Sequence, residues 1–549
     1  MECMKKRTGL GTKSLRVCLL GAVLLSLTAC GGGPRDGVSP TPIPSWIHYP
    51  SQGLKTLWRS VVRHEPDSPL ACREFIRYRS ANDSNPVPHV PIPHHPFMAP
   101  NPGSNMHADA YLSDTYEAGG PLGLGPEVRS RTQGFGGYGT IAFDRAGRLV
   151  AVYSNGRKFQ LEVMDPDTLE ELGSHDLPPR PWHFPLQGVL PWKYIGAGMY
   201  FYLDEQDRAV VPTTGNTILV IEVPGPGGKG EFRRVREYDL SDHVVPAPWP
   251  KQDSVAWVLP GWSGAHYWYA TTGGMVGTVN RRSGAVRTRR LEGEKIENAF
   301  AVAEDGVFIL SDRALYRFNP DGEGNILEDW RTEYDRGPGP KPGHITRGSG
   351  TSVTLMGGSD GLAVIADNAE PRINLVFYRR SDGAEVASAP VFQEGKSGTD
   401  LTTIGFEHGN ERGEGTGVYS VIVENNWGHH SFPRSHPIPG LTRVDATRRE
   451  DGTFHCEEVW ASREKSIGGF RLSFGNGLVY MYGKGESCPV TTWHFTAVDF
   501  ATGETVYRMP TGTGLGYNNW QGSLFLHPDG GKTYSTTIFG LVMLQDGTP

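Results

Sequence analysis

One sequence pattern recurs eight times between Gly137 and Pro549, and it limits the possible folds more than any other feature of the chain. Each copy contains an apolar run, a tight turn, a second apolar run, a polar turn and a third run. Such runs, cut by turn residues, are typical of strands. The turns between the first two runs are centred, 42 to 60 residues apart, at Gly147, Asp207, Gly264, Gly306, Gly361, Gly417, Gly477 and Gly531.

Repeats of this length in β-rich sequence are typical of propeller blades. We therefore expect an all-β fold, in which residues 137–549 form a single eight-bladed β-propeller of four-stranded antiparallel blades. The last copy lacks an outer strand, and a strand from upstream of Gly137 is expected to supply it. Closing the ring in this way removes an exposed sheet edge.

Several of the third runs end in a turn that resembles the repeat of quinoprotein-type propellers. The best copy is FTAVDFATGETVYRM, Phe495 to Met509, and GTVNRRSGAVRTRR and YRRSDGAEVASAP are weaker copies. On these segments the chain resembles a divergent member of the quinoprotein-like (PQQ-repeat-like) eight-bladed superfamily. The resemblance implies the fold and, in the dehydrogenases, pyrroloquinoline quinone beside Ca²⁺. We do not expect that cofactor here, because the adjacent Cys-Cys pair of the alcohol-oxidising members is absent and the tryptophan-docking repeats are degraded.

The chain begins with a secretion signal, because basic residues precede an apolar run from Val17 to Leu27 that is too short to span a membrane. The signal ends in Leu-Thr-Ala-Cys, which resembles the bacterial lipobox and predicts lipidation of Cys30. An ordinary signal peptide is the alternative. We expect a signal peptide over residues 1–29, a flexible tether over 30–45 and a Pro-rich arm that packs on the propeller over 46–136.

These features predict a protein of the bacterial cell envelope, anchored by lipid on the extracytoplasmic side. Removal of residues 1–29 changes the formal net charge from −7 to −11, which disfavours nucleic-acid binding. In an oxidising compartment a Cys456–Cys488 disulfide is one expectation, and ordinary core cysteines are the other.

Polar side chains lie just before the first strand or just after the second strand of several copies. Both positions are at one end of a blade, so we expect these side chains to meet around one mouth of the central channel. Oxygen ligands from carboxylates and amides suit Ca²⁺. The alternative is that Asn and Asp end these strands only because they form turns. The candidate ligands are Glu297, Asn298, Asp367, Asn368, Glu424, Asn425 and Asn518.

Loops beside this mouth carry His344 and His429, which are candidates for a general base near neutral pH. The basic residues Arg336, Lys341 and Arg347 suit either an anionic ligand or a solvated loop. A further cluster, His89, His94 and His95, is a weaker metal candidate, because intervening prolines hinder its convergence.

The sequence therefore predicts a binding or scaffold protein that takes a small molecule or an envelope protein at this mouth. The alternative is a Ca²⁺-dependent hydrolase or lyase, similar in ligand chemistry to lactonase-type propellers. A PQQ-dependent dehydrogenase is the least favoured function. Whether the protein is an enzyme is left open by the sequence.

Overall fold

The computed structural model describes the chain from residue 75 onward, with short gaps. The predicted signal peptide, Cys30 and the tether lie outside the described residues, as does Cys488. The described ranges are 75–79, 85–134, 136–155, 158–179, 199–228, 230–244, 253–342, 344, 347–429, 438, 440–485, 492–519 and 521–547.

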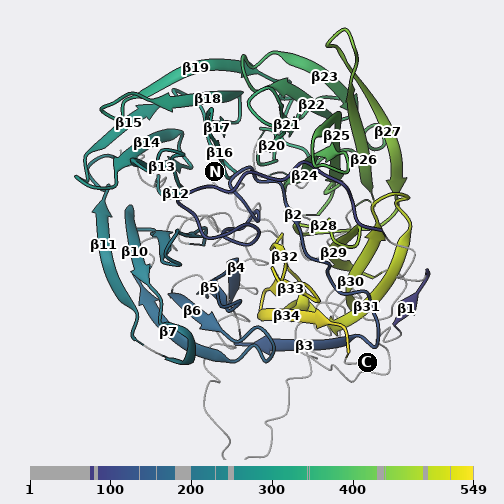
Figure 1. Ribbon diagram of the computed structural model, residues 1–549, viewed down its shortest axis with the longest axis horizontal. Helices are drawn as coiled ribbons and strands as arrows, with labels where there is room; N and C mark the ends of the chain where they lie inside the picture. Colours follow the sequence, from purple (N-terminus) through teal and green to yellow (C-terminus); the bar gives the residue numbers. More distant parts are fainter. Residues whose placement is uncertain are drawn as a thin grey trace, which may run out of the picture. The chain divides into compact units, whose positions relative to one another are not determined.

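Eight antiparallel sheets of the predicted kind form a ring around a central channel (Figure 1), which confirms the expected fold class. The first four blades, each from its innermost to its outermost strand, are β4 (Gly137–Phe143), β5 (Leu149–Ser154), β6 (Phe159–Met164) and β7 (Glu171–Leu177); β8 (Tyr202–Leu203), β9 (Ala209–Pro212), β10 (Thr217–Glu222) and β11 (Arg233–Asp239); β12 (Val255–Pro260), β13 (His266–Thr271), β14 (Met275–Asn280) and β15 (Val286–Arg290); and β16 (Ala301–Ala303), β17 (Gly306–Leu310), β18 (Ala314–Pro320) and β19 (Ile326–Glu333).

The remaining blades continue in the same order around the ring. They are β20 (Thr354–Met356), β21 (Leu362–Ala366), β22 (Asn374–Arg379) and β23 (Glu385–Pro390); β24 (Thr403–Gly409), β25 (Gly415–Glu424), β26 (Leu441–Arg448) and β27 (Phe454–Ser462); β28 (Arg471–Ser473), β29 (Leu478–Lys484), β30 (Thr492–Asp499) and β31 (Thr505–Thr513); and β32 (Leu524–Leu526), β33 (Lys532–Thr537) and β34 (Gly540–Gln545), with β3 (Glu127–Thr132) outermost in the eighth blade.

Strand β3 closes the ring, as the sequence predicts. It pairs antiparallel with β34 over six residues, from Glu127 opposite Gln545 to Thr132 opposite Gly540. Two more short strands extend the seventh blade, where β1 (Ile76–Arg77) pairs with β31 and β2 (Thr115–Tyr116) runs parallel to β28. The chain upstream of the first blade therefore covers edges that would otherwise lack partners.

The core consists of apolar clusters between neighbouring blades. Inner strands such as β12 and β17 are buried along their whole length, so they read as continuous apolar runs. Outer strands such as β19 and β27 are mostly exposed and polar. One cluster joins Tyr138 and Ile141 of the first blade to Phe525 and Tyr534 of the eighth. Hydrophobic burial thus holds the two ends of the repeat together, in addition to the β3–β34 ladder.

Two tryptophans join neighbouring blades in the same way. Trp460 on β27 donates a hydrogen bond from Nε1 to the Phe500 carbonyl at 2.8 Å, and its ring covers Gly503 in the following blade. Trp330 on β19 makes the equivalent contacts with the Arg380 carbonyl, at 3.0 Å, and with Gly383. Gly503 has φ +73°, and any Cβ there would overlap the indole. This contact accounts for the Thr-Gly turn within the Phe495 to Met509 motif.

The predicted turn centres agree with the structure except in the sixth blade. Seven of the eight lie in the β-turns or at the strand ends that join the first two strands of their blades. Gly417 instead lies inside β25, because the turn of this blade comes earlier, between Gly409 and Gly415. A register shift between Glu407 and Gly409 accompanies the change.

Candidate functional site

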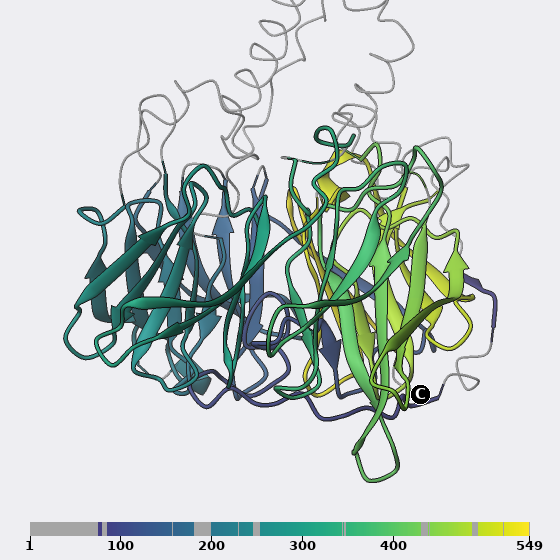
Figure 2. The ribbon, with the colours of Figure 1, turned by 90° about the horizontal axis from the view of Figure 1, so that it is seen from above.

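The centre of the ring is filled by residues 99–116, which we call the plug. In Figures 1 and 2 the purple trace of this region lies within the ring and along one of its faces. Its carbonyls accept hydrogen bonds from the innermost strands of four successive blades. The pairs are Val302 N–H to Ala110 O (2.9 Å), Leu355 N–H to Tyr111 O (2.9 Å), Gly405 N–H to Ser113 O (3.2 Å) and Leu472 N–H to Asp114 O (3.2 Å).

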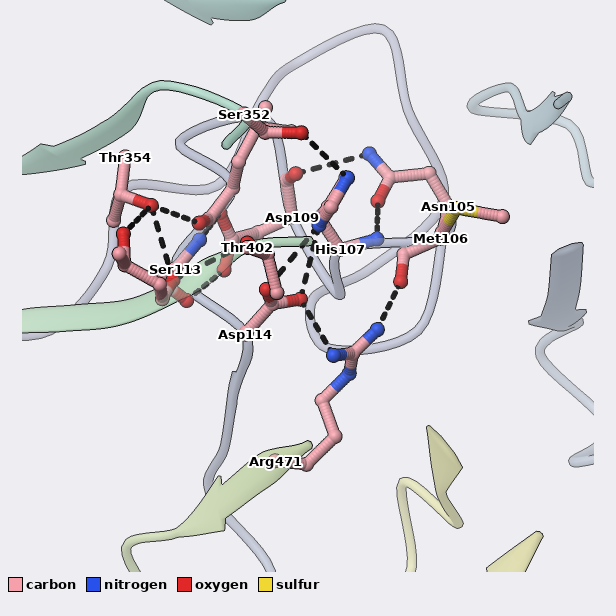
Figure 3. Close-up of polar contacts among 12 residues, drawn as sticks. Asn105, Met106, His107, Asp109, Ser113, Asp114, Ser352, Thr354, Thr402 and Arg471 are labelled. Atoms are coloured by element: carbon pink, nitrogen blue, oxygen red, sulfur yellow. Dashed lines mark hydrogen bonds and ion pairs between the residues drawn. The ribbon is translucent and has the colours of Figure 1, made fainter. Parts of the chain in front are cut away.

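Charged side chains fix the plug inside the channel (Figure 3). Arg471, at the start of β28, forms an ion pair with Asp114 at 3.0 Å, and both side chains are fully buried. The same guanidinium donates to the Met106 carbonyl in the plug. His107 lies 3.2 Å from Asp114 through Nδ1 and 3.3 Å from the Ser352 hydroxyl through Nε2. The side chains of this cluster are buried, so removing one of them leaves a charged or polar group buried without its partner. They are Arg471, Asp114, His107 and Ser352.

A second carboxyl in the plug, Asp109, is 2% exposed. It accepts hydrogen bonds from the Tyr111 N–H at 2.8 Å and from the Ser113 hydroxyl. Burial raises the pKa of Asp109 to about 7, and the charge of Asp114 adds to the shift, while the Ser113 hydrogen bonds oppose it. The Asp109 carboxyl therefore resists ionisation. Its hydrogen bonds stabilise the local turn of the plug.

Ser352, His107 and Asp114 contact one another in the sequence hydroxyl, imidazole, carboxylate. The nucleophile, base and orienting carboxylate of a catalytic triad contact one another in the same sequence. Ser352 is 3% exposed and the channel around it is occupied by the plug, and Asp114 is shared with Arg471. We therefore interpret this cluster as the attachment of the plug. The sequence prediction missed all of these residues, because the plug and the β-strands that meet it are far apart in the chain. The polar residues of Asn105 to Asp114 were the available signal.

The segments that lead into the innermost strands also meet around Asp400. The Gln521 amide, which precedes β32, donates to the Asp400 carboxylate at 3.1 Å. Asn426, which follows β25, accepts from the Asp400 backbone N–H at 2.9 Å. Asp400 and Gln521 are half-buried, whereas Asn426 is fully buried. Asn426 thus supports the loop, and Asp400 presents its carboxylate at the mouth.

Three more blades contribute to this mouth. Asn298, before β16, donates to the Gly350 carbonyl at 2.6 Å, and Gly350 lies directly against Thr399 and Asp400. Burial raises the pKa of Tyr200, before β8, to about 12, and the negative charge of Asp400 adds to this shift. Leading segments from the second, fourth, fifth, sixth and eighth blades therefore meet at the loop that carries Asp400, and Gln521 contacts its carboxylate. We call Tyr200, Asn298, Asp400 and Gln521 the mouth cluster.

Glu424 and Asn425 lie behind this cluster. Glu424 is fully buried and accepts a hydrogen bond from Asn426 Nδ2 at 2.8 Å. Burial raises its pKa to about 7, against the effects of Asn426 and the neighbouring Ser466. Asn425 donates to the Lys396 carbonyl at 2.8 Å. Among the described residues, Glu424 Oε2 has no hydrogen-bond partner, and neither has Oδ1 of the buried Asn519.

The other predicted ligands are placed between the fourth and fifth blades or in the eighth. Glu297 lines a small cavity together with Asn298 and Asp312. Asp367 accepts from the Asn374 backbone and side chain at 2.6 and 2.7 Å, and burial raises its pKa. These bonds occupy Asp367 in its own turn.

Two carboxamides complete the predicted ligand set. Asn368 donates from Nδ2 to the Arg336 carbonyl at 2.8 Å, which ties its strand to the loop before the fifth blade. Asn518 is buried and its backbone N–H donates to Leu515 O at 3.0 Å. The described residues contain no cluster of three or more His, Cys, Asp or Glu side chains arranged to hold a metal ion. The Ca²⁺ site stays a prediction.

The predicted catalytic histidines lie next to the mouth cluster. His344 is half-buried and faces Gly398, two residues before Asp400. His429 is 4% exposed, and its backbone N–H donates to the Asn426 carbonyl at 2.9 Å. Their catalytic role stays a prediction, as does a metal at the N-terminal histidines.

The basic residues of the neighbouring loop have structural partners. Arg336 pairs with Asp312 at 2.8 Å. Lys341 is buried, donates to the Ala369 carbonyl, and has a pKa lowered by burial. Arg347 donates to the Gly337 carbonyl at 2.8 Å. These contacts hold the loop before the fifth blade in place.

The N-terminal histidines are separately engaged. His89 stacks on Phe474 and lies 3.0 Å from Glu117. His95 packs edge-on against Trp262, and burial lowers its pKa to about 3. His95 is therefore uncharged at neutral pH and serves as a core residue at the second and third blades.

Comparison with known proteins adds little beyond the fold. No family model matches the chain. A protein of Archaeoglobus fulgidus described as uncharacterised is 30% identical over 164 residues, so the match spans 29% of this chain and 31% of that protein. No helix in the described part of the chain has the length and apolar character needed to cross a bilayer.

Solved structures of similar fold share little sequence with this chain. BamB from Moraxella catarrhalis matches with 11% identity and a TM-score of 0.33, over 62% of this chain and 94% of that one. The β-propeller domain of Myceliophteria thermophila Cps50 (Swd1) matches with 11% identity and a TM-score of 0.36, over 63% and 95% of the two chains. The class of protein, an eight-bladed β-propeller with a plugged channel, is defined by the eight sheets themselves.

Proposed function

We propose that this protein is a lipid-anchored binding protein of the bacterial cell envelope, and that its ligand site is the mouth cluster. The observation that carries the proposal is the convergence of five blades on the loop that carries Asp400. Polar groups that converge from several structural elements are typical of ligand sites. The lipid anchor rests on the sequence around Cys30.

The chemistry of the cluster favours a small ligand rich in hydroxyl or amino groups. Asp400 supplies acceptors, Gln521 and Asn298 supply both donors and acceptors, and Tyr200 supplies a hydroxyl that stays protonated at neutral pH. Glu297 adds a second half-buried carboxylate beside Asn298. This charge disfavours an anionic ligand at the mouth.

The binding role is tested by thermal unfolding against a panel of monosaccharides, amino acids, polyamines and Ca²⁺. A ligand selective for the folded state raises Tm by mass action. We expect a stabilising compound whose effect is lost in Asp400→Asn and Gln521→Ala and retained in the control Glu328→Gln on an outer strand. Stabilisation that survives both mouth substitutions, or none from any compound, contradicts the proposal. Lipidation is tested separately, by incorporation of labelled palmitate in wild type and Cys30→Ala.

A second candidate is a Ca²⁺-dependent hydrolase or lyase, and Glu424 favours it. A carboxyl with a pKa of about 7 is suited to general acid-base chemistry. Glu424 Oε2 and Asn519 Oδ1 are oxygen atoms of the kind that coordinate a hard cation such as Ca²⁺. A Tm increase with Ca²⁺ that is reversed by chelator and absent in Glu424→Gln distinguishes this candidate from binding alone. The relation to quinoprotein-like propellers is a further proposal, supported by the docking of Trp330 and Trp460 on the turns of the next blades.

A further inference from the structure

A cavity of about 700 Å³ lies between the second and third blades, away from the mouth cluster. Its walls come from β10, β11 and β13 and from the turns at 261–265 and 280–282. Basic and aromatic side chains dominate the lining, and they include Arg208, Arg236, Arg281, Arg282 and Tyr267, with Glu205 as the acidic member.

The cavity is positively charged on an acidic protein. Four guanidinium groups and one carboxylate line it, whereas the whole chain has a formal net charge of −7. Arg208 pairs with Asp204 at 2.6 Å and Arg281 pairs with Glu205 at 3.2 Å. Within the described part of the chain, these ion pairs leave Arg236 and Arg282 without a carboxylate partner. Two positive charges are therefore uncompensated.

The guanidinium groups of Arg281 and Arg236 are held in place before any ligand arrives. The Arg281 guanidinium lies 5.2 Å from the Phe97 ring centre and 5.0 Å from that of Tyr267. Tyr238 donates from its hydroxyl to the Arg281 carbonyl at 2.6 Å, which fixes the turn that carries Arg282. Arg236 lies 5.3 Å from the Tyr238 ring centre and donates to the Arg282 carbonyl. Preorganised guanidinium groups lose little entropy on binding.

We propose that this cavity binds a small organic polyanion, either a phosphate ester or a polycarboxylate. Guanidinium groups bind both oxyanions through paired, charge-assisted hydrogen bonds. The volume is that of a small-molecule site rather than of an ion contact. Tyr267 and Tyr238 are buried beneath Arg281 and Arg236, so they hold these guanidinium groups at the cavity wall. The site is independent of the mouth cluster, whose carboxylate, Asp400, favours the opposite charge.

The test is isothermal titration of the full-length mature protein with inorganic pyrophosphate and with citrate, at fixed ionic strength. We expect the double variant Arg236→Gln, Arg282→Gln to weaken binding at least about tenfold, because two charge-assisted contacts are lost. The control Arg289→Gln removes a half-buried arginine of the third blade that pairs with Glu328 and does not line the cavity, and it should bind as wild type. Glu205→Gln, which removes the acidic lining residue, should bind several times more tightly.

The probes separate the two ligand chemistries. Binding of pyrophosphate alone supports a phosphate ester, and binding of citrate alone supports a polycarboxylate. Failure of both anions to bind overturns the proposal, as does binding that the double variant leaves unchanged or that Arg289→Gln weakens equally. Arg236 and Arg282 are exposed, so both variants should fold, and an unchanged Tm without ligand verifies this. Asp400→Asn should leave anion binding intact.

Discussion

Replacement of Arg471 by Met tests whether charged side chains hold the plug in the channel. The substitution removes the ion pair with Asp114 and the hydrogen bonds to the carbonyls of Met106 and Phe470. Asp114 then stays fully buried, with His107 as its remaining side-chain partner at 3.2 Å. Removing one member of a buried ion pair costs about 3 to 5 kcal/mol. We expect Arg471→Met to lower the free energy of unfolding by that amount.

The measurement is urea unfolding followed by tryptophan fluorescence, with the loss read from the midpoint at unchanged slope. Limited proteolysis within residues 99–116 gives a second readout, because a detached plug exposes its backbone. The matched control is Arg233→Met, which removes an exposed ion pair with Glu222 and should change stability by less than about 0.5 kcal/mol.

A double variant isolates the electrostatic part of the loss. Asn at position 114 removes the uncompensated charge, so Arg471→Met with Asp114→Asn should recover at least about 1 kcal/mol relative to Arg471→Met alone. A loss below about 1 kcal/mol in the single variant, or strict additivity in the double variant, would refute the idea that the ion pair anchors the plug.

Three further predictions concern other parts of the ring. In urea unfolding, Trp460→Ala should lower the free energy of unfolding by about 3 to 5 kcal/mol. Trp460→Phe should lower it by less, since the Phe variant loses mainly the hydrogen bond to the Phe500 carbonyl. Equal losses would contradict the idea that the Trp460 ring joins the two blades. Because the pKa of Glu424 is raised to about 7, the stability that its protonated form contributes declines as pH increases from about 4.5 to about 7. In stability profiles measured from Tm against pH, Glu424→Gln should flatten this decline and increase the free energy of unfolding by up to about 3 kcal/mol above pH 7. A steeper decline in the variant would show that the pKa of Glu424 is lowered by folding rather than raised. Gly350→Ala should lower the free energy of unfolding by more than about 1 kcal/mol, because Gly350 has φ +82° and its Cβ would lie 2.2 Å from the Thr399 carbonyl. Gly358→Ala should not, because a Cβ there meets no atom within 4 Å. Equal effects of the two substitutions would show that the loop at Asp400 adjusts to the added Cβ without cost.

The sequence predicted the ring because its periodicity reports local structure. Apolar runs and Gly or Asp turns specify strands and hairpins wherever they occur, and eight copies specify the number of blades. The strand that closes the ring was also predictable, since the last copy is one strand short and an edge must be covered.

The candidate site was predicted only in part. Asn298 reaches the Asp400 loop through Gly350, and Glu424 bonds Asn426, which supports the same loop; the ligand role predicted for these residues stays a prediction. The sequence analysis did not identify Asp400, since nothing in the segment before β24 distinguishes this residue from the aspartates of ordinary turns. Its role depends on Gln521 and Tyr200, which approach it from other blades.

The sequence by itself thus determined the blade count, the strand order within each blade and the closing strand, all of which depend on neighbours along the chain. The tertiary structure alone decided which polar groups are buried, which face the mouth and where arginines gather. It also placed residues 99–116 inside the channel, against β28 more than 300 residues away. The physical reason is that solvation and ion pairing depend on distance in space, and closing the ring sets those distances.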